Sequence, residues 1–169
     1  AQVDELKKQI PGLDKKYPNY SDFAGKTAKD IFGSKAINRS LKKKAVMFES
    51  CLFLNDGKGK FIKSALPTEA QFSPVRDIIS HDLDKDGKTD ILLVGNDYTA
   101  KPNYGRYDAS YGWCLLSDTA STFNALFPSA SGFRTDGDTR KIVMLDAAGK
   151  KYFVVGVNNG NIQIFKCLR

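Results

Sequence analysis

The sequence predicts a mainly β protein with a helical N-terminal segment, and three observations support this fold class. Apolar residues recur at helical spacing near the start of the chain, as at Val3, Leu6 and Ile10. The rest of the chain consists of short runs rich in β-branched and aromatic residues, which turn-forming residues separate. Part of this region occurs twice, which indicates a repeated unit. We therefore expect a helical segment over residues 1–44 and a β region over residues 45–169.

The helical segment divides into short helices. Pro11-Gly12 ends the first, and Ser21 is a candidate N-cap for a second helix over residues 22–32, with Gly33 just past its end. A third helix is expected over residues 34–41. Because the apolar stripe of these helices is narrow, we expect them to pack on the β region rather than build a core of their own.

The β region begins with a predicted hairpin. Strands over residues 46–54 and 61–65 flank the turn Asn55–Lys60, and its Asn-Asp-Gly-Lys-Gly run is a strong hairpin signal. The pattern of residues 76–96 then recurs, with a shorter central loop, over residues 140–158. Each copy continues into a further hairpin. The β region is therefore predicted to hold about two four-stranded antiparallel units.

The most informative stretch lies between two predicted strands, over residues 82–90. It places carboxylates at positions 1, 3, 5 and 9 of a tight loop and glycine at position 6. Calcium takes about six to eight oxygen ligands, and this spacing can gather several carboxylates around one ion. The alternative is an acidic hairpin turn without a metal. The predicted Ca²⁺ ligands are the side chains of Asp82, Asp84, Asp86 and Asp90 and the main-chain carbonyl of Lys88.

The flanks of this loop argue against a helical calcium switch. An EF-hand needs a bidentate Glu at position 12 and a helix on each side, whereas position 12 here is Leu93. The segment over residues 91–95 is a short apolar run that predicts a buried strand. We therefore expect the ion to lie between two strands and to have a structural role.

A strand, the DxDxDGxxD loop and a strand that ends in Leu93-Val94-Gly95-Asn96 together resemble an FG-GAP/VCBS repeat. Residues 53–61, 66–74 and 105–112 are similar to the last blades of the ASPIC/CRTAC-like group of VCBS proteins. The resemblance covers roughly residues 45–166. It implies that the repeated units are blades of a partial, calcium-bearing β-propeller. It also implies a secreted or cell-surface location, which in a Gram-negative bacterium is the periplasm or the outer membrane.

The longest irregular stretch, over residues 98–112, is a second candidate site. It holds four tyrosines, and binding residues concentrate on such loops. The candidate ligand-binding residues are Tyr104, Arg106, Tyr107 and Asp108. In the alternative interpretation, the aromatic rings pack down onto the blade.

Composition excludes several classes of protein. The net charge is +7, with much of the excess in the first 63 residues, but no nucleic-acid-binding motif accompanies it, so we expect no nucleic-acid partner. No apolar run in the sequence approaches the about 20 residues that a membrane-spanning helix needs.

Because the chain begins at Ala1 rather than Met, we expect a processed product or a fragment. The three cysteines lack the spacing of a zinc site, and no disulfide is expected to be essential.

The sequence contains no recognisable catalytic set. There is no Ser-His-Asp arrangement and no phosphate-binding glycine loop, and His81 is the only histidine. The leading hypothesis is a non-catalytic calcium-binding module for binding, adhesion or scaffolding. Its partner would be another protein or the remainder of a longer propeller chain, with a glycan as a further possibility. The alternative is the propeller portion of a surface polysaccharide-processing enzyme.

Overall fold

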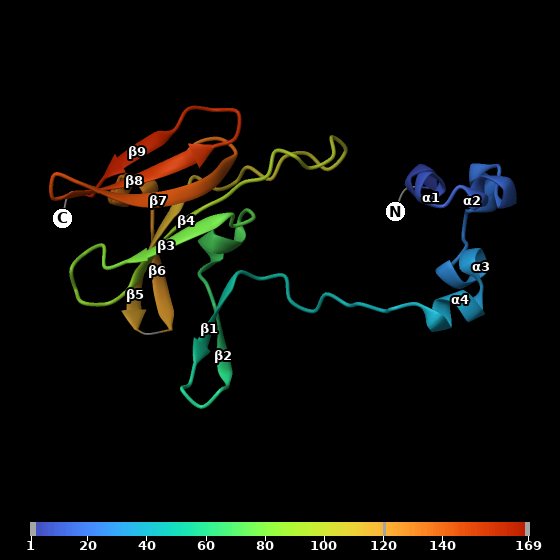
Figure 1. Cartoon of the computed structure of the whole chain (residues 1–169), viewed down its shortest axis with the longest axis horizontal. Helices are drawn as coiled ribbons and strands as arrows, with labels where there is room; N and C mark the ends of the chain where they lie inside the picture. Colours follow the sequence, from blue (N-terminus) through green and yellow to red (C-terminus); the bar gives the residue numbers. More distant parts are fainter. Residues whose placement is uncertain (1–2, 120, 168–169) are drawn as a thin grey trace. The chain divides into compact units, whose positions relative to one another are not determined.

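The computed structural model describes residues 3–119 and 121–167 and divides into two compact units, Ala1–Val46 and Met47–Arg169. Within the described residues the chain is mainly β, as predicted, with nine strands in three antiparallel sheets (Figure 1). Among these residues no helix is long and apolar enough to span a membrane, in agreement with the sequence.

The N-terminal unit consists of short helices with a small core of their own. Leu13, Tyr17, Phe23 and Ile31 form a buried cluster, so the expectation that these helices lack a core is wrong. A ring contact of 5.0 Å between the centroids of Tyr17 and Phe23 shows why, because two aromatic side chains bury much area in few residues. The elements are α1 (Val3–Gln9), α2 (Gly12–Lys16), η1 (Tyr20–Asp22), α3 (Ala28–Phe32) and α4 (Ser34–Arg39).

The predicted helix over residues 22–32 is shorter than expected. It begins at Ala28, because Thr27 rather than Ser21 caps it. The Asp30 backbone N–H donates to the Thr27 hydroxyl at 3.4 Å, and the Thr27 backbone N–H donates to the Asp30 carboxylate at 2.7 Å. This reciprocal capping box fixes the start of the helix, whereas Ser21 lies within η1.

The C-terminal unit is a stack of three sheets (Figure 1). A two-stranded hairpin, a four-stranded meander and a three-stranded meander follow one another along the chain. The strands are β1 (Cys51–Asn55), β2 (Phe61–Ala65), β3 (Asp77–His81), β4 (Asp90–Val94), β5 (Trp113–Thr119), β6 (Thr122–Leu126), β7 (Thr139–Ala147), β8 (Lys150–Val157) and β9 (Gln163–Lys166). Two short helices complete the unit, η2 (Thr68–Gln71) and α5 (Pro128–Ser131).

The four-stranded sheet lies between the other two sheets, and its strand β4 is covered on both faces. On β4, Ile91 and Leu93 belong to a core cluster that Leu52 of β1 joins. Leu92 and Val94 point to the other face and join a second cluster. That second cluster also contains Ile142, Phe153 and Val155 of the three-stranded sheet. All five residues of β4 are buried, as a continuous apolar run predicts.

The predicted number of strands per unit is correct for one sheet. Strands β3 to β6 form a four-stranded antiparallel sheet in chain order. Among the described residues the second copy of the repeat contributes three strands, β7 to β9, rather than four. The hairpin of β1 and β2 is a separate two-stranded sheet. The stack is open, and no sheet closes on itself among the described residues.

Candidate metal centre

The acidic loop joins the end of β3 to the start of β4. Gly87 has φ +85° and Lys85 has φ +67°, so the backbone passes twice through the left-handed region and curls the loop tightly. This curl brings three of the predicted ligands together. Carboxylate oxygens of Asp82, Asp84 and Asp86 all lie within 4.8 Å of one another. Oxygens that bind one calcium ion at about 2.3–2.6 Å are separated by distances of this order.

Backbone amides of the loop hold each carboxylate in place. The Gly87 N–H donates to Asp82 Oδ2 at 3.1 Å, and the Asp86 N–H donates to Asp84 Oδ1 at 3.1 Å. The Lys88 N–H donates to Asp86 Oδ1 at 2.8 Å. These bonds orient the three side chains before any ion binds, which lowers the entropic cost of binding.

One oxygen of the cluster is buried and has no hydrogen-bond donor. Asp82 Oδ1 is inaccessible to solvent and lacks a partner, although the other oxygen of this carboxylate accepts from Gly87. A buried carboxylate oxygen without a partner is costly, and a bound cation would remove that cost. The donor set of hard carboxylate oxygens fits calcium better than it fits a soft transition metal.

A lysine also lies against the cluster. Lys88 Nζ is 2.9 Å from Asp86 Oδ2. The Lys88 side chain and its backbone N–H hold the pKa of Asp86 below its usual range, and Asp86 in turn raises the pKa of Lys88. The Lys88 ammonium therefore neutralises part of the acidic cluster and would compete with a metal for Asp86.

Asp90, the fourth predicted carboxylate ligand, is engaged elsewhere. It is 1% exposed. Its Oδ2 accepts the Leu83 N–H and its Oδ1 accepts the Ser117 N–H, both at 2.8 Å. Asp90 thus ties the start of the loop to β5 and does not belong to the group of three. The Lys88 carbonyl stays a predicted ligand.

The loop is also anchored in the core. Leu83, between the first two aspartates, packs against the cluster that joins the central sheet to the three-stranded sheet.

The turn between β7 and β8, at the matching place in the second repeat, differs from the acidic loop. Ala148 and Gly149 form a two-residue turn there, and Asp146 pairs with Lys151 at 3.3 Å.

The second candidate site lies at the opposite end of the strands, on the long loop after β4. A bridge between Asp97 and Tyr107 closes its base, with backbone hydrogen bonds of 2.8 and 3.0 Å. Tyr104 is 67% exposed and Tyr107 is 50% exposed, so both rings lie at the surface rather than in the core. The Arg106 guanidinium lies 4.7 Å from the centre of the Tyr98 ring, and Asp108 is exposed.

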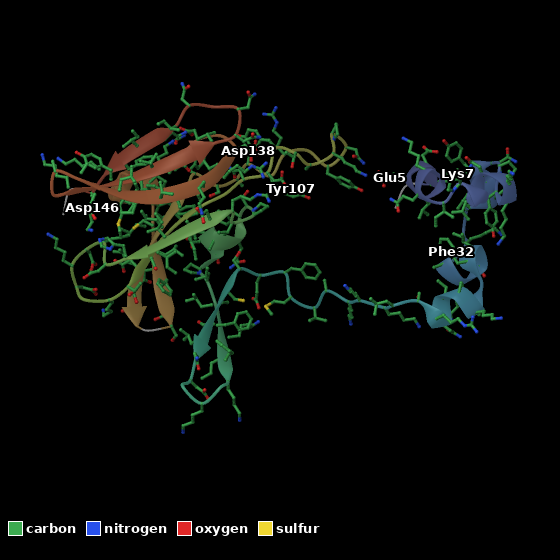
Figure 2. The ribbon with its side chains drawn as sticks, in the orientation of Figure 1. Glu5, Lys7, Phe32, Tyr107, Asp138 and Asp146 are labelled. Atoms are coloured by element: carbon green, nitrogen blue, oxygen red, sulfur yellow. The ribbon has the colours of Figure 1, made fainter. Side chains whose placement is uncertain are left out.

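A cluster of charged residues beside this loop was not predicted. Arg76 Nη2 lies 2.7 Å from Asp97 Oδ2, and Arg140 Nη2 lies 2.7 Å from the buried Asp138 Oδ2 and 3.8 Å from Asp97 Oδ1. Figure 2 shows Asp138 and Tyr107 at this end of the sheets and Asp146 at the other. The sequence did hold a signal, because Arg76 and Arg140 occupy matching places in the two copies of the repeat. Asp97 thereby bridges the central and three-stranded sheets.

A pocket of about 520 Å³ between these two sheets was also not predicted. Its walls are mostly apolar, and Asp84 of the acidic loop reaches its edge. Cys114 and Cys167 line it, and neither forms a disulfide among the described residues. Burial, with smaller contributions from the charges of Asp90 and Asp84, raises the pKa of Cys114 to about 11. This thiol is therefore protonated at neutral pH.

Comparison of the chain with protein-family models, curated proteins and solved structures finds no match. We therefore infer the function of the chain from its residues and their geometry. The similarity to FG-GAP/VCBS repeats stays a prediction from the loop and its flanking strands.

Proposed function

We propose that this chain is a non-catalytic, calcium-binding β-propeller-type module of the FG-GAP/VCBS kind. In this proposal it acts in binding, adhesion or scaffolding at the cell surface or in a secreted protein, as part of a larger assembly. The observation that carries the proposal is the group of Asp82, Asp84 and Asp86, in which Asp82 Oδ1 is buried without a donor.

The position of the group supports a structural role for the ion. The loop joins two strands of the central sheet, and Leu83 fixes it in the core. A ligand that binds only the folded chain stabilises it by mass action, by about 2.7 kcal/mol at a hundredfold excess over Kd. Calcium would thus hold the loop ends of β3 and β4 together, and partners would be bound by other surfaces.

The exposed loop over residues 98–112 supports a binding role. Tyr104 and Tyr107 present their rings at the surface, beside Arg106 and Asp108. Exposed aromatic and arginine side chains are enriched where proteins bind partners. The second candidate is the propeller portion of a surface polysaccharide-processing enzyme, in which the same four residues would contact the glycan. Hydrolysis of a glycan that Asp108→Asn abolishes without unfolding the chain would support that alternative.

Titration of the metal-free chain with calcium, followed by calorimetry, tests the metal site. We expect one ion per chain and a melting temperature that chelator lowers by several degrees. Asp84→Asn should abolish both effects. Asp146→Asn is the matched control, because Asp146 is an exposed aspartate near the end of β7, beside the equivalent turn of the second repeat.

Lys88→Met provides a second arm of the test. If the Lys88 ammonium competes with calcium for Asp86, its removal should tighten calcium binding by severalfold. A wild-type melting curve that chelator leaves unchanged, with no heat of calcium binding, would refute the proposal.

A further inference from the structure

The positive charge of the chain is concentrated in its N-terminal unit. Residues 1–46 hold eleven Lys and Arg side chains against five Asp and Glu side chains, so they carry +6 of the net charge of +7. The β unit that follows is nearly neutral, with fifteen basic and fourteen acidic side chains. Such an asymmetry between two parts of a chain indicates that the basic part meets a negatively charged partner.

The segment between α4 and β1 presents part of this charge openly. Residues 41–48 are exposed and form no helix or strand (Figure 1). We call them the basic segment, because they include Lys42, Lys43 and Lys44. None of these three lysines forms an ion pair with a described residue. Their charges are therefore available to a partner outside the chain.

The basic segment also exposes large apolar side chains. Leu41 is 81% exposed, Val46 is 78% exposed and Phe48 is 89% exposed. The sequence predicts a strand from residue 46, yet the strand begins only at Cys51, so sheet pairing does not cover Val46 or Phe48. Apolar side chains in water favour a contact that buries them. The segment therefore combines apolar and positively charged groups within a few residues.

The chain rejoins the fold directly after the basic segment. Glu49 forms an ion pair with Lys63 of β2, and the Ser50 N–H donates to Gln71 Oε1 at 2.7 Å. The acidic side chain closest in sequence is thus already paired, and it does not neutralise the lysines of the segment. These contacts fix where the segment ends and leave residues 41–48 to bind a partner.

We propose that the basic segment binds the surface of a bilayer that contains anionic phospholipids. The lysine ammonium groups would contact the lipid phosphates, and Leu41, Val46 and Phe48 would enter the boundary between headgroups and acyl chains. Lysines near an anionic leaflet and apolar side chains buried at this depth contribute together to peripheral membrane binding. This binding requires no membrane-spanning helix.

The apolar side chains distinguish lipid from other anionic partners. Duplex nucleic acid attracts lysines through its phosphates, but it offers no apolar layer to Val46 and Phe48. An acidic protein partner would need a surface complementary to a segment without regular structure. A bilayer presents charge and an apolar layer without a fixed shape, so it fits both properties of the segment.

Co-sedimentation of the 169-residue chain with lipid vesicles tests the proposal. One set of vesicles contains phosphatidylcholine alone, and the other contains phosphatidylcholine and phosphatidylglycerol. All measurements are made in chelator, so that calcium cannot bridge the acidic loop to the lipid. We expect the chain to bind the anionic vesicles at least tenfold more tightly than the neutral ones, and we expect added salt to weaken this binding.

Variants of the basic segment test each part of the contact. Lys42→Gln combined with Lys43→Gln should weaken binding to anionic vesicles at least tenfold, because each lysine near an anionic surface contributes about fivefold. Phe48→Ser should weaken this binding severalfold. All three positions are exposed and lie outside regular structure, so the variants should fold, and circular dichroism checks this.

Matched controls come from the exposed hairpin of β1 and β2. Lys58→Gln combined with Lys60→Gln also removes two charges, and Phe61→Ser removes a phenylalanine that is 63% exposed. Both controls should bind like the wild type. A lysine control that loses as much binding as the segment variant would show that total charge is responsible, and it would overturn the proposal.

Two further results would overturn the proposal. The first is a failure to bind anionic vesicles, or equal binding to neutral ones. The second is vesicle binding that Phe48→Ser leaves unchanged in a chain that binds duplex DNA at least as tightly, which would indicate a nucleic-acid partner. The basic segment contains no residue of the acidic loop, so this test and the calcium titration can succeed or fail separately.

Discussion

Asp90 illustrates how much a single carboxylate in an acidic loop depends on its surroundings. Its two oxygens accept the N–H groups of Leu83 and Ser117, and the side chain is almost fully buried. Its neighbours Asp84 and Asp86 are held by groups of the loop itself, which are backbone amides and, for Asp86, also the Lys88 ammonium. The same residue type therefore has a backbone-fixing role at the end of the loop and a ligand-like position within it.

Asp90→Ala should destabilise the fold whether or not calcium is present. The substitution removes the Asp90 acceptor from the part-buried Leu83 N–H and from the buried Ser117 N–H, and the loss of each bond costs about 1–3 kcal/mol. We expect a loss of about 2–5 kcal/mol in the free energy of unfolding, measured by urea denaturation in calcium and in chelator. A loss that appears only in calcium would show instead that Asp90 is a ligand.

The raised pKa of Cys114 predicts a loss of stability at alkaline pH. In the unfolded chain the thiol ionises near its ordinary value of 9.0, whereas in the folded chain it ionises at about 11. The folded state therefore binds more protons between these values, and its stability falls as pH rises from about 9 to about 11. The expected loss is about 2–3 kcal/mol. Denaturation of the wild type and of Cys114→Val across this range measures it, and parallel pH profiles would contradict the prediction.

In the hairpin of β7 and β8, the turn residue Ala148 has a backbone conformation that alanine disfavours. Ala147 pairs with Lys150, so Ala148 and Gly149 form a two-residue turn. Both have positive φ, +50° and +70°, which is typical of a type I′ turn. Glycine accepts this conformation readily, but alanine does not.

Ala148→Asn should therefore stabilise the protein, because asparagine tolerates the left-handed conformation and Asn-Gly favours this turn. The expected gain is about 0.5–1 kcal/mol in the free energy of unfolding. Ala147→Asn, one residue earlier in the strand, is the matched control and should bring no gain. Equal effects of the two substitutions would argue against relief of backbone strain.

The whole molecule consists of two units, and the segment between their ordered elements is exposed. Residues 41–49 are all exposed and lie outside any helix or strand, and they include Lys42-Lys43-Lys44. Brief trypsin treatment should cut at these lysines first, because proteases cleave exposed chain without regular structure. We expect a resistant fragment that begins close to Ala45, identified by mass spectrometry. Its circular dichroism should retain the β signal, and prompt degradation of this fragment would contradict the prediction.

The features best predicted from the sequence are those that short local patterns determine, such as the positions of strands and turns. Strand positions from Phe61 onward followed short apolar runs and strong turn signals. The carboxylates of Asp82, Asp84 and Asp86 lie within 4.8 Å of one another, and their role as metal ligands stays a prediction. The role of Asp90 was not predictable, because its partner Ser117 lies on β5, far along the chain. The order of the sheets in the stack and the Arg76–Asp97–Arg140 bridge depend on tertiary packing, which single-sequence patterns do not encode.

The complete burial of β4 has a consequence for measurement. Amide hydrogens of a strand covered on both faces and paired on both edges exchange with solvent only when the whole domain opens. Leu92 and Leu93 pair with β3 on one side and with β5 on the other. Their exchange rates in deuterated water should therefore report the global free energy of unfolding, without any denaturant. Amides of the edge strand β9 should exchange faster, through local fraying. The slowly exchanging amides of Leu92 and Leu93 therefore allow the free energies of unfolding of the variants to be compared under native conditions.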